Sequence, residues 1–232
     1  MRIEWPFGRS AYRRRAFRQP RIWSNRVLST IAPLFTGSVI NVSAWRDEDK
    51  EGGRYSDYFS NASGYSISNY TGDCGATGRQ DEVALDLSED LPQNLHRAFD
   101  VVFNHTTLEH IFDVRKAFAN LCEMSRDVVI VVVPFMQPSH IKSSYEDYWR
   151  FTPQALRRMF TEQGMQVVFE SSNHPTHAGV YVLAVAARDP DKWRGKLRPS
   201  RVCDHDLGCH VFQTAHLWRR MRNWLTRHRQ GS

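Results

Sequence analysis

Residues 99–135 read FDVVFNHTTLEHIFDVRKAFANLCEMSRDVVIVVVPF, and this stretch decides the fold. It contains an apolar segment, Asp100–Phe103, and a β-branched segment, Val128–Val133, and both favour buried strands. Between them, Asp113 can cap a helix. One side of that helix is apolar and consists of Val114, Ala117, Phe118, Leu121 and Cys122. The stretch therefore predicts a strand, a helix and a second strand of a parallel sheet.

Five further segments have the composition of strands: Ser38–Val42, Tyr65–Asn69, Glu82–Leu85, Val167–Glu170 and Val180–Ala187. Helical spacing of apolar residues from Val27 to Phe35 predicts a helix before the first of them. Another helix should begin at Thr152-Pro153 and end at Gly164. The last two strands are close enough in the chain to pair antiparallel. Residues 25–187 are therefore expected to form a three-layer α/β/α domain around a doubly wound, seven-stranded mixed sheet.

Charge divides the chain into a central part and two basic ends. Residues 1–30 hold 8 Lys or Arg and 1 acidic residue, and residues 188–232 hold 11 and 4, whereas residues 31–187 hold 12 and 20. Residues 1–24 predict a basic arm, and residues 188–232 predict a linker and a basic amphipathic helix. Three explanations are open, in this order: pairing with the acidic body or simple solvation, contact with an anionic membrane surface, and nucleic-acid binding.

The composition excludes a membrane-spanning protein and a disulfide-rich secreted scaffold. The longest nearly unbroken apolar run, Val128–Met136, has about nine residues, whereas a spanning helix needs roughly 20. The N-terminal region has no apolar stretch followed by a cleavage site, and four scattered cysteines are too few for a disulfide framework. We expect a cytoplasmic protein, with peripheral membrane contact left open by the basic ends.

Polar residues follow most of the predicted strands. They are Ser43 to Asp47 after the first strand, Asn69 and Tyr70 after the second, Asp86 after the third, and Asn104 to Thr106 after the fourth. Ligands of open α/β sheets bind beyond the carboxyl ends of the strands. The sequence therefore predicts a ligand site at this edge of the sheet.

The stretch quoted above, with LEH at 108–110, and the later DYWRFTP at 147–153 resemble class I S-adenosylmethionine-dependent methyltransferases. The resemblance covers about residues 34–187 and is closest to bacterial members that modify glycans and small molecules. It implies a Rossmann-like fold, S-adenosylmethionine as cofactor, and methyl transfer to a hydroxyl of a small molecule or glycan. Two alternatives are a catalytically inactive binding protein with the same fold, and a nucleic-acid methyltransferase or binder.

The resemblance places the cofactor against Asn41, Ser43, Ala44, Asn69, Asp86, Leu87, Asn104 and His105. Asp86 matches an acid that contacts adenine, and Asn69 stands where the family has a ribose-binding acid. The family's glycine-rich turn is replaced by NVSAWRDEDKEGG at 41–53, with the bulky Trp45 and Arg46. An indole of Trp45 that fills the adenosyl pocket would exclude catalysis and favour the inactive alternative.

The loop QPSHIKSSYEDYWRF at 137–151 holds the candidate catalytic pair, His140 as general base and Asp147 as its orienting partner. Acceptor-binding candidates are Glu109, His110, Tyr148, Trp149 and Arg150. The last three can form an aromatic and cationic wall for a sugar or an anionic acceptor, or can pack the loop onto the body. Against a catalytic role, a loop histidine is more often a solvated or capping residue.

Two clusters raise the question of a metal site. His105, Glu109 and His110 lie close in sequence, but adjacent residues cannot share a helical face and no third ligand follows at standard spacing. The tail places Cys203, His205, Cys209 and His210 close together, but as one short cluster without a second half. The sequence therefore predicts no metal site.

Overall fold

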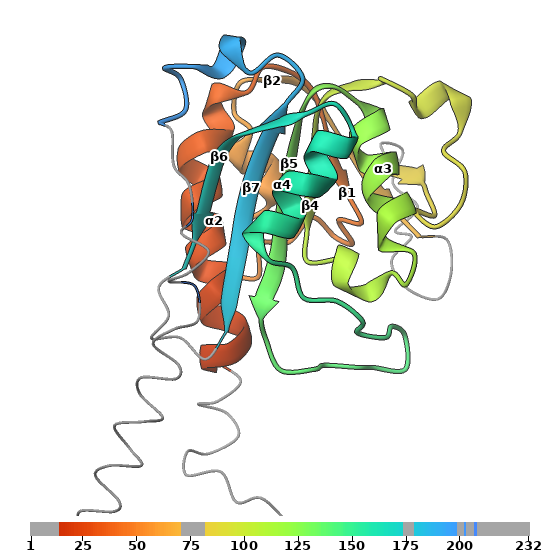
Figure 1. The fold of residues 1–232 in the computed structure, drawn as a ribbon, viewed down its shortest axis with the longest axis vertical. Helices are drawn as coiled ribbons and strands as arrows, with labels where there is room; N and C mark the ends of the chain where they lie inside the picture. The colour runs from red at the N-terminus through yellow and green to blue at the C-terminus, as the bar shows by residue number, and fades with distance from the viewer. Residues whose placement is uncertain (1–13, 71–81, 174–178, 199–201, 203–206, 208–232) are drawn as a thin grey trace, which may run out of the picture.

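The computed structural model describes residues 14–70, 82–173 and 179–198, together with Val202 and Leu207. Within this part, seven strands form one sheet in the order β3-β2-β1-β4-β5-β7-β6 (Figure 1). The strands are β1 (Gly37–Val42), β2 (Ala62–Asn69), β3 (Glu82–Ala84), β4 (Phe99–His105), β5 (Ser125–Met136), β6 (Gln166–Ser172) and β7 (Val180–Ala187). Strand β7 runs antiparallel to both of its neighbours, and the other pairs are parallel. The predicted seven-stranded mixed sheet is confirmed.

Helices cover both faces of the sheet, which makes the three predicted layers (Figure 1). The α-helices are α2 (Gln19–Ile31), α3 (Val114–Met124) and α4 (Pro153–Glu162). Shorter helical turns are η1 (Arg14–Arg18), η2 (Ala32–Leu34), η3 (Tyr55–Tyr58), η4 (Gln93–Leu95), η5 (Leu108–His110) and η6 (Asp191–Trp193). Helix α2 packs in one hydrophobic core with one face of the sheet, and α3 and α4 share the other core with the opposite face.

The helix ends follow from residues that the sequence places there. Asp113 accepts a hydrogen bond from the Lys116 amide at 3.2 Å and caps α3. Thr152 accepts one from the Ala155 amide at 3.0 Å and caps α4, whose first residue is Pro153. Local capping chemistry therefore sets both N-termini as predicted.

Helical structure begins earlier than the sequence predicts. We expected ordered structure from Asn25, but η1 begins at Arg14 and α2 at Gln19. The face of α2 that is buried includes Ser24 and Asn25, and these polar side chains bond to the body of the domain. A helix face that is partly polar shows no apolar period, so the pattern does not reveal it.

Several predictions fall outside the described residues. These residues exclude 1–13 and, apart from Val202 and Leu207, everything from 199 onward. The C-terminal helix, the cluster Cys203, His205, Cys209 and His210, and membrane or nucleic-acid contact by the basic ends therefore stay predictions. Within the described part, no helix is both long and apolar enough to cross a bilayer.

Candidate functional site

The carboxyl ends of β1 and β4 lie side by side, and there the order of the strands reverses. The chain proceeds from β1 through β2 to β3 on one side and from β4 to β5 on the other. A sheet that reverses in this way leaves a crevice beyond the strand ends, where ligands bind. In Figure 1 this is the lower edge, where β5 ends and α2 begins.

The loop after β1 has an unusual backbone. Ser43, Trp45 and Asp47 have φ angles of 59°, 52° and 60°, in the left-handed region that favours glycine. Non-glycine residues rarely adopt this conformation, and such residues cluster at functional sites. The loop thus keeps a glycine-type path although its side chains are not glycine.

Neighbouring side chains hold this path in place. The carboxylate of Asp47 accepts hydrogen bonds from Asn41 Nδ2 at 2.8 Å, the Tyr65 hydroxyl at 2.7 Å and the Ser56 amide at 3.0 Å. Asn41, a predicted cofactor residue, therefore anchors the loop. The amide of Ala44 donates to the Ser68 carbonyl of β2 at 3.0 Å.

Asn69 also binds the loop. Its Oδ1 accepts from the Trp45 amide at 2.6 Å, and its Nδ2 donates to the Trp45 carbonyl at 2.9 Å and to Glu82 at 2.6 Å. The amide that we expected at the ribose is therefore engaged with protein. The indole of Trp45 is 47% exposed and lies 3.9 Å from Lys50 Nζ, so it does not fill an interior pocket.

The chain after β3 brings Asp86 and Leu87 to the same edge of the sheet. Leu87 is buried in the core. Asp86 Oδ1 accepts from the amide of Ser88 at 2.8 Å and from its hydroxyl at 2.5 Å. The carboxylate is half-buried and sits in a turn that orients it.

Asn104, at the end of β4, offers a free acceptor at the strand reversal. Its Nδ2 donates to the Val42 carbonyl at 2.9 Å, which ties β4 to β1. Its Oδ1 is buried and has no hydrogen-bond partner among the described residues. Since an unsatisfied buried acceptor costs roughly 1–3 kcal/mol, a ligand that donates here gains that energy.

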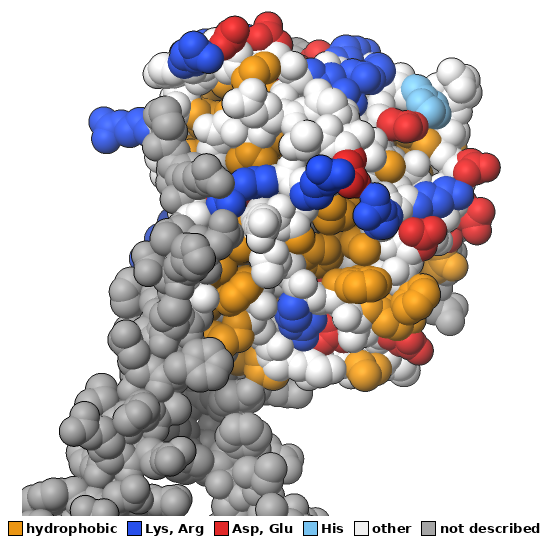
Figure 2. Space-filling model, viewed as in Figure 1, with side chains coloured by type: hydrophobic (Ala, Val, Ile, Leu, Met, Phe, Trp, Pro, Cys, Tyr) orange, Lys and Arg blue, Asp and Glu red, His pale blue; other side chains and the backbone are white. Residues whose placement is uncertain are grey.

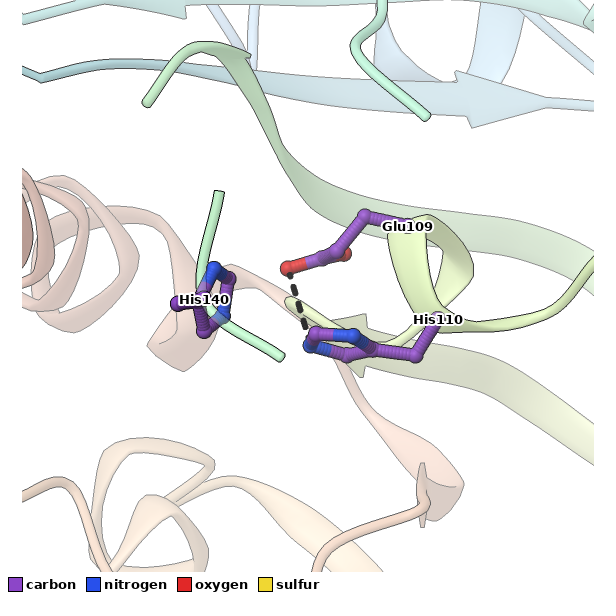
Figure 3. A group of neighbouring side chains, drawn as sticks. All are labelled: Glu109, His110 and His140. Atoms are coloured by element: carbon purple, nitrogen blue, oxygen red, sulfur yellow. Dashed lines mark ion pairs between the residues drawn. The ribbon is translucent and has the colours of Figure 1, made fainter. Parts of the chain in front are cut away.

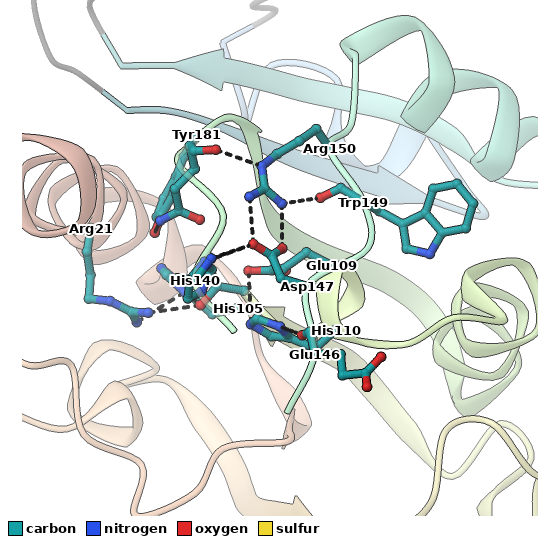
Figure 4. A network of polar contacts seen from close by, with 12 residues as sticks. Arg21, His105, Glu109, His110, His140, Glu146, Asp147, Trp149, Arg150 and Tyr181 are labelled. Carbon is teal, nitrogen blue, oxygen red and sulfur yellow. Dashed lines mark hydrogen bonds and ion pairs between the residues drawn. The ribbon is translucent and has the colours of Figure 1, made fainter. Parts of the chain in front are cut away.

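His105 lies against α2. Arg21 donates to Nδ1 of His105 at 3.2 Å (Figure 4). Nε2 of His105 lies 2.9 Å from the Ser24 hydroxyl. Burial, with help from the Arg21 charge, lowers the pKa of His105 well below its usual value, so the ring is neutral. Both ring nitrogens have protein partners, which supports an anchoring role, and the contact with the cofactor stays a prediction.

The loop from 137 to 150 closes over η5. The carbonyl oxygen of Glu109 accepts from the amides of Tyr148 and Trp149, at 2.8 and 3.2 Å. His110 Nδ1 lies 2.5 Å from the Glu146 carbonyl oxygen, to which it donates. These bonds bring residues 36 to 40 positions apart in the sequence into one site (Figure 4).

The predicted pair of His140 and Asp147 is in contact. His140 Nδ1 lies 3.2 Å from Asp147 Oδ2, although not in hydrogen-bond geometry, and the His140 amide donates to the same oxygen at 2.9 Å. Arg150 binds both oxygens of Asp147, at 2.6 and 2.8 Å. Burial would raise the pKa of Asp147, but the Arg150 and amide hydrogen bonds outweigh it and lower that pKa, so the carboxylate stays ionised.

Two of the three predicted wall residues present an exposed ring. Tyr148 and Trp149 are 42% and 37% exposed, and Phe112 beside them is 72% exposed. The indole nitrogen of Trp149 donates to the Ile111 carbonyl at 3.0 Å, which packs the loop onto the body. Arg150 is fully engaged by Asp147 and by backbone carbonyls. Figure 2 shows hydrophobic side chains gathered on the lower part of one face, near which Lys, Arg, Asp and Glu are interspersed.

Glu109 is the most unusual group of the site. Its side chain is fully buried, and neither oxygen has a hydrogen-bond partner in the described part of the chain. Burial raises the pKa of Glu109 to about 8, so the carboxyl is largely protonated at neutral pH. His110 Nε2 lies 3.7 Å from Glu109 Oε1 (Figure 3). Burial also lowers the pKa of both His110 and His140, so both imidazoles are neutral.

Arg21 is a residue that the sequence analysis missed. Its guanidinium also donates to the Tyr55 hydroxyl at 3.1 Å and to Thr106 Oγ1 at 2.9 Å. It lies within an arginine-rich segment in which no local signal distinguishes it from its neighbours. Its place in the site depends on how α2 docks.

No protein-family model matches this sequence, and no curated protein matches it. Solved structures do resemble its fold. The chain is similar to 1,6-didemethyltoxoflavin-N1-methyltransferase of Burkholderia thailandensis, which was solved with S-adenosylhomocysteine. The TM-score is 0.53 at 17% sequence identity, and the match covers 81% of this chain and 92% of that chain. It is also similar to magnesium protoporphyrin IX methyltransferase of Synechocystis, which was solved with S-adenosylmethionine. Here the TM-score is 0.51 at 10% sequence identity, and the match covers 82% of this chain and 87% of that chain. It is also similar to the cyclase SpnF, with TM-score 0.50, 10% identity, and 71% and 81% of the two chains covered. At these identities the likeness shows the fold, which is that of class I methyltransferases.

Proposed function

We propose that this protein is an S-adenosylmethionine-dependent methyltransferase that acts on a small-molecule or glycan hydroxyl. The observation that carries the proposal is the free Oδ1 of Asn104, buried at the strand reversal beside a loop of glycine-type backbone. The fold supports it, because ligands of such sheets bind at this position.

The residues at the crevice suit the methionine part and the adenine of the cofactor. Ser43 and Ala44 have small side chains, so the methionine part can approach the loop closely. Asn104 Oδ1 can accept from its ammonium group, and Asp86 can accept from the adenine amino group. When bound, the cofactor supplies a methyl group activated by its sulfonium.

Methyl transfer requires an acceptor held in line with the methyl carbon and shielded from water. In this proposal His140 takes the proton of the acceptor hydroxyl, since its ring is neutral and lies in the loop over the site. Asp147, held by Arg150, orients His140. The exposed rings of Tyr148 and Trp149 provide a surface for a ring-shaped acceptor.

Calorimetric titration of the full chain with S-adenosylhomocysteine tests the proposal. We expect binding at micromolar ligand, weakened about tenfold or more in Asp86→Ala because one charged hydrogen bond is worth roughly 1.5–3 kcal/mol. Asp90→Ala is the matched control, since Asp90 is an exposed acid four residues away that pairs with Lys116. His140→Ala should leave the affinity unchanged, because it contacts the acceptor and not the cofactor. No heat at millimolar ligand would refute the proposal.

The second candidate is a binding protein of the same fold that does not use this cofactor. The engagement of Asn69 by Trp45 and Glu82 favours it, because the amide expected at the ribose is already bonded. The structure named as a cyclase has a similar fold, which illustrates that the fold alone does not imply methyl transfer. Absence of binding in the same titration, with a folded protein, would support this candidate.

A further inference from the structure

Three side chains beside the crevice converge from two segments of the chain. Glu109 and His110 lie on η5, and His140 lies in the loop after β5 (Figure 3). One potential ligand atom from each side chain lies within 4.8 Å of the other two. Among the described residues, these three form a group that could hold a metal ion. The spacing in the sequence did not indicate it because the third member is 30 positions away.

The carboxyl oxygens of Glu109 lack partners. Both are buried without a hydrogen-bond partner in the described structure. A native fold rarely leaves two such atoms on one side chain, because each costs roughly 1–3 kcal/mol. Their position beside two histidines indicates that something other than protein satisfies them.

The surrounding contacts suit a cation. His110 donates Nδ1–H to the Glu146 carbonyl oxygen, which leaves Nε2 unprotonated and directed toward Glu109. His140 Nδ1 lies 3.2 Å from Asp147 Oδ2, which can orient the ring and leave Nε2 for an ion, as carboxylates do for metal-bound histidines. The charge of Asp147 is balanced by Arg150, so Glu109 is the carboxylate left to balance an ion.

The nearby cation Arg21 does not occupy this position. Its hydrogen bonds go to Tyr55, His105 and Thr106. It lies near enough to influence Glu109 electrostatically, but no salt bridge joins the two among the described contacts. The position between Glu109 and the two histidines is thus left to a ligand.

We propose that Glu109, His110 and His140 form a binding site for a divalent transition-metal ion. Two imidazoles and one carboxylate suit zinc, cobalt, manganese or iron, whereas magnesium and calcium prefer oxygen ligands. Three protein ligands leave at least one coordination position for water or another oxygen ligand. If the proposed methyl transfer is also correct, that position is where the acceptor's oxygen would bind, and the ion would then take the place of His140 as the group that makes the acceptor's hydroxyl easier to deprotonate.

Titration of the chelator-treated full chain with cobalt(II), followed by visible absorption and calorimetry, tests the site. The tail residues Cys203 and Cys209 could bind the same ion, so the titration is repeated in a Cys203→Ser/Cys209→Ser background. We expect one equivalent to bind in both backgrounds without a thiolate charge-transfer band. His140→Ala and Glu109→Gln should weaken binding roughly 100-fold or more, since even supporting residues cost 10–100-fold.

A matched control uses another pair of the same residue types. His96 and Glu123 form an exposed pair at 3.4 Å that belongs to no three-residue group among the described residues. His96→Ala should therefore leave cobalt affinity unchanged. His140 lies in a loop, so His140→Ala should keep the metal-free unfolding midpoint, and added metal should raise that midpoint in the wild type but not in the variant.

Three results would overturn the proposal: no binding at millimolar cobalt, equal affinity in His140→Ala and the wild type, or binding that disappears with the two cysteines. The S-adenosylhomocysteine titration is independent of these outcomes. Metal binding without cofactor binding would support the metal site and refute the proposed methyl transfer. Cofactor binding without metal binding would support the cofactor site and refute the metal site.

Discussion

His105 illustrates how a single buried residue can hold two elements together. It lies at the end of β4, and its ring is enclosed by Tyr55, Phe103 and Tyr181 and bonded to α2 through Arg21 and Ser24. Nδ1 lies within hydrogen-bond distance of Arg21 and Thr106, and Nε2 of Ser24. A proton on the ring would remove the acceptor that Arg21 uses and place two cations side by side.

The neutral ring predicts a specific pH dependence of stability. Because the folded-state pKa of His105 is lowered, the unfolded chain binds a proton that the folded chain does not as pH falls below about 6.5. The stabilisation is complete above that pH and is lost below it, with a slope approaching about 1.4 kcal/mol per pH unit. Denaturant unfolding from about pH 5 to pH 8 should show a shallower decline in His105→Gln than in the wild type.

The comparison needs a control for the loss of a histidine. His96→Gln changes a surface histidine and serves that purpose. The pKa values of His110 and His140 are also lowered. Both histidines reduce stability at low pH in the wild type and in His105→Gln alike, so their effect cancels when the two pH profiles are subtracted. Parallel pH profiles for the wild type and His105→Gln would contradict the assignment.

At the scale of elements, the docking of η1 and α2 completes the site. The rings of Phe17 in η1 and His140 pack edge to face, with their centroids 5.2 Å apart. Arg21 of α2 donates a hydrogen bond to Thr106. Gly179, just before β7, permits this approach, because a Cβ there would lie 2.1 Å from the Ala16 carbonyl oxygen and 3.1 Å from Pro20 Cγ. The backbone of η1 therefore lies directly against the backbone of the residue before β7.

We expect Gly179→Ala to destabilise the protein by about 1–3 kcal/mol, the usual cost of overpacking, because η1 must move away from β7. Gly64→Ala in β2 is the matched control, since a Cβ there would meet nothing within 4 Å. Denaturant midpoints of the two variants measure the difference. Equal midpoints would show that the contact between η1 and the residue before β7 does not contribute to stability.

At the scale of the whole molecule, the two candidate ligands occupy different parts of one edge of the sheet. The cofactor residues come from the ends of β1, β3 and β4, and the metal residues from η5 and the loop after β5. Amide hydrogen exchange measures how readily each segment opens locally. It can therefore detect ligand binding at the two sites separately.

We expect S-adenosylhomocysteine to slow amide exchange at residues 43–47 and 85–87, and zinc to slow it at residues 137–150. Strand β6, at the far edge of the sheet, is the internal control and should change little. Exchange followed by mass spectrometry measures each segment. Slowing confined to 137–150 with either ligand would contradict the assignment of the cofactor to the β1 and β4 crevice.

The sequence by itself determined the elements and their type. The positions of all seven strands, the caps at Asp113 and Thr152, and the mixed sheet follow from local composition and apolar period, because those signals act over a few neighbouring residues. It also predicted the pairing of His140 with Asp147, which lie in one short loop.

Tertiary structure alone decided which distant residues meet. Three features depend on how the sheet orders its strands and where the loops close. They are the early start of α2, the hydrogen bonds of Asn69 to Trp45, and the convergence of His140 with Glu109 and His110. Such contacts join residues far apart in the chain through polar groups that carry no periodic pattern. Their physical basis is the satisfaction of buried polar atoms, which takes effect once the core has brought them together.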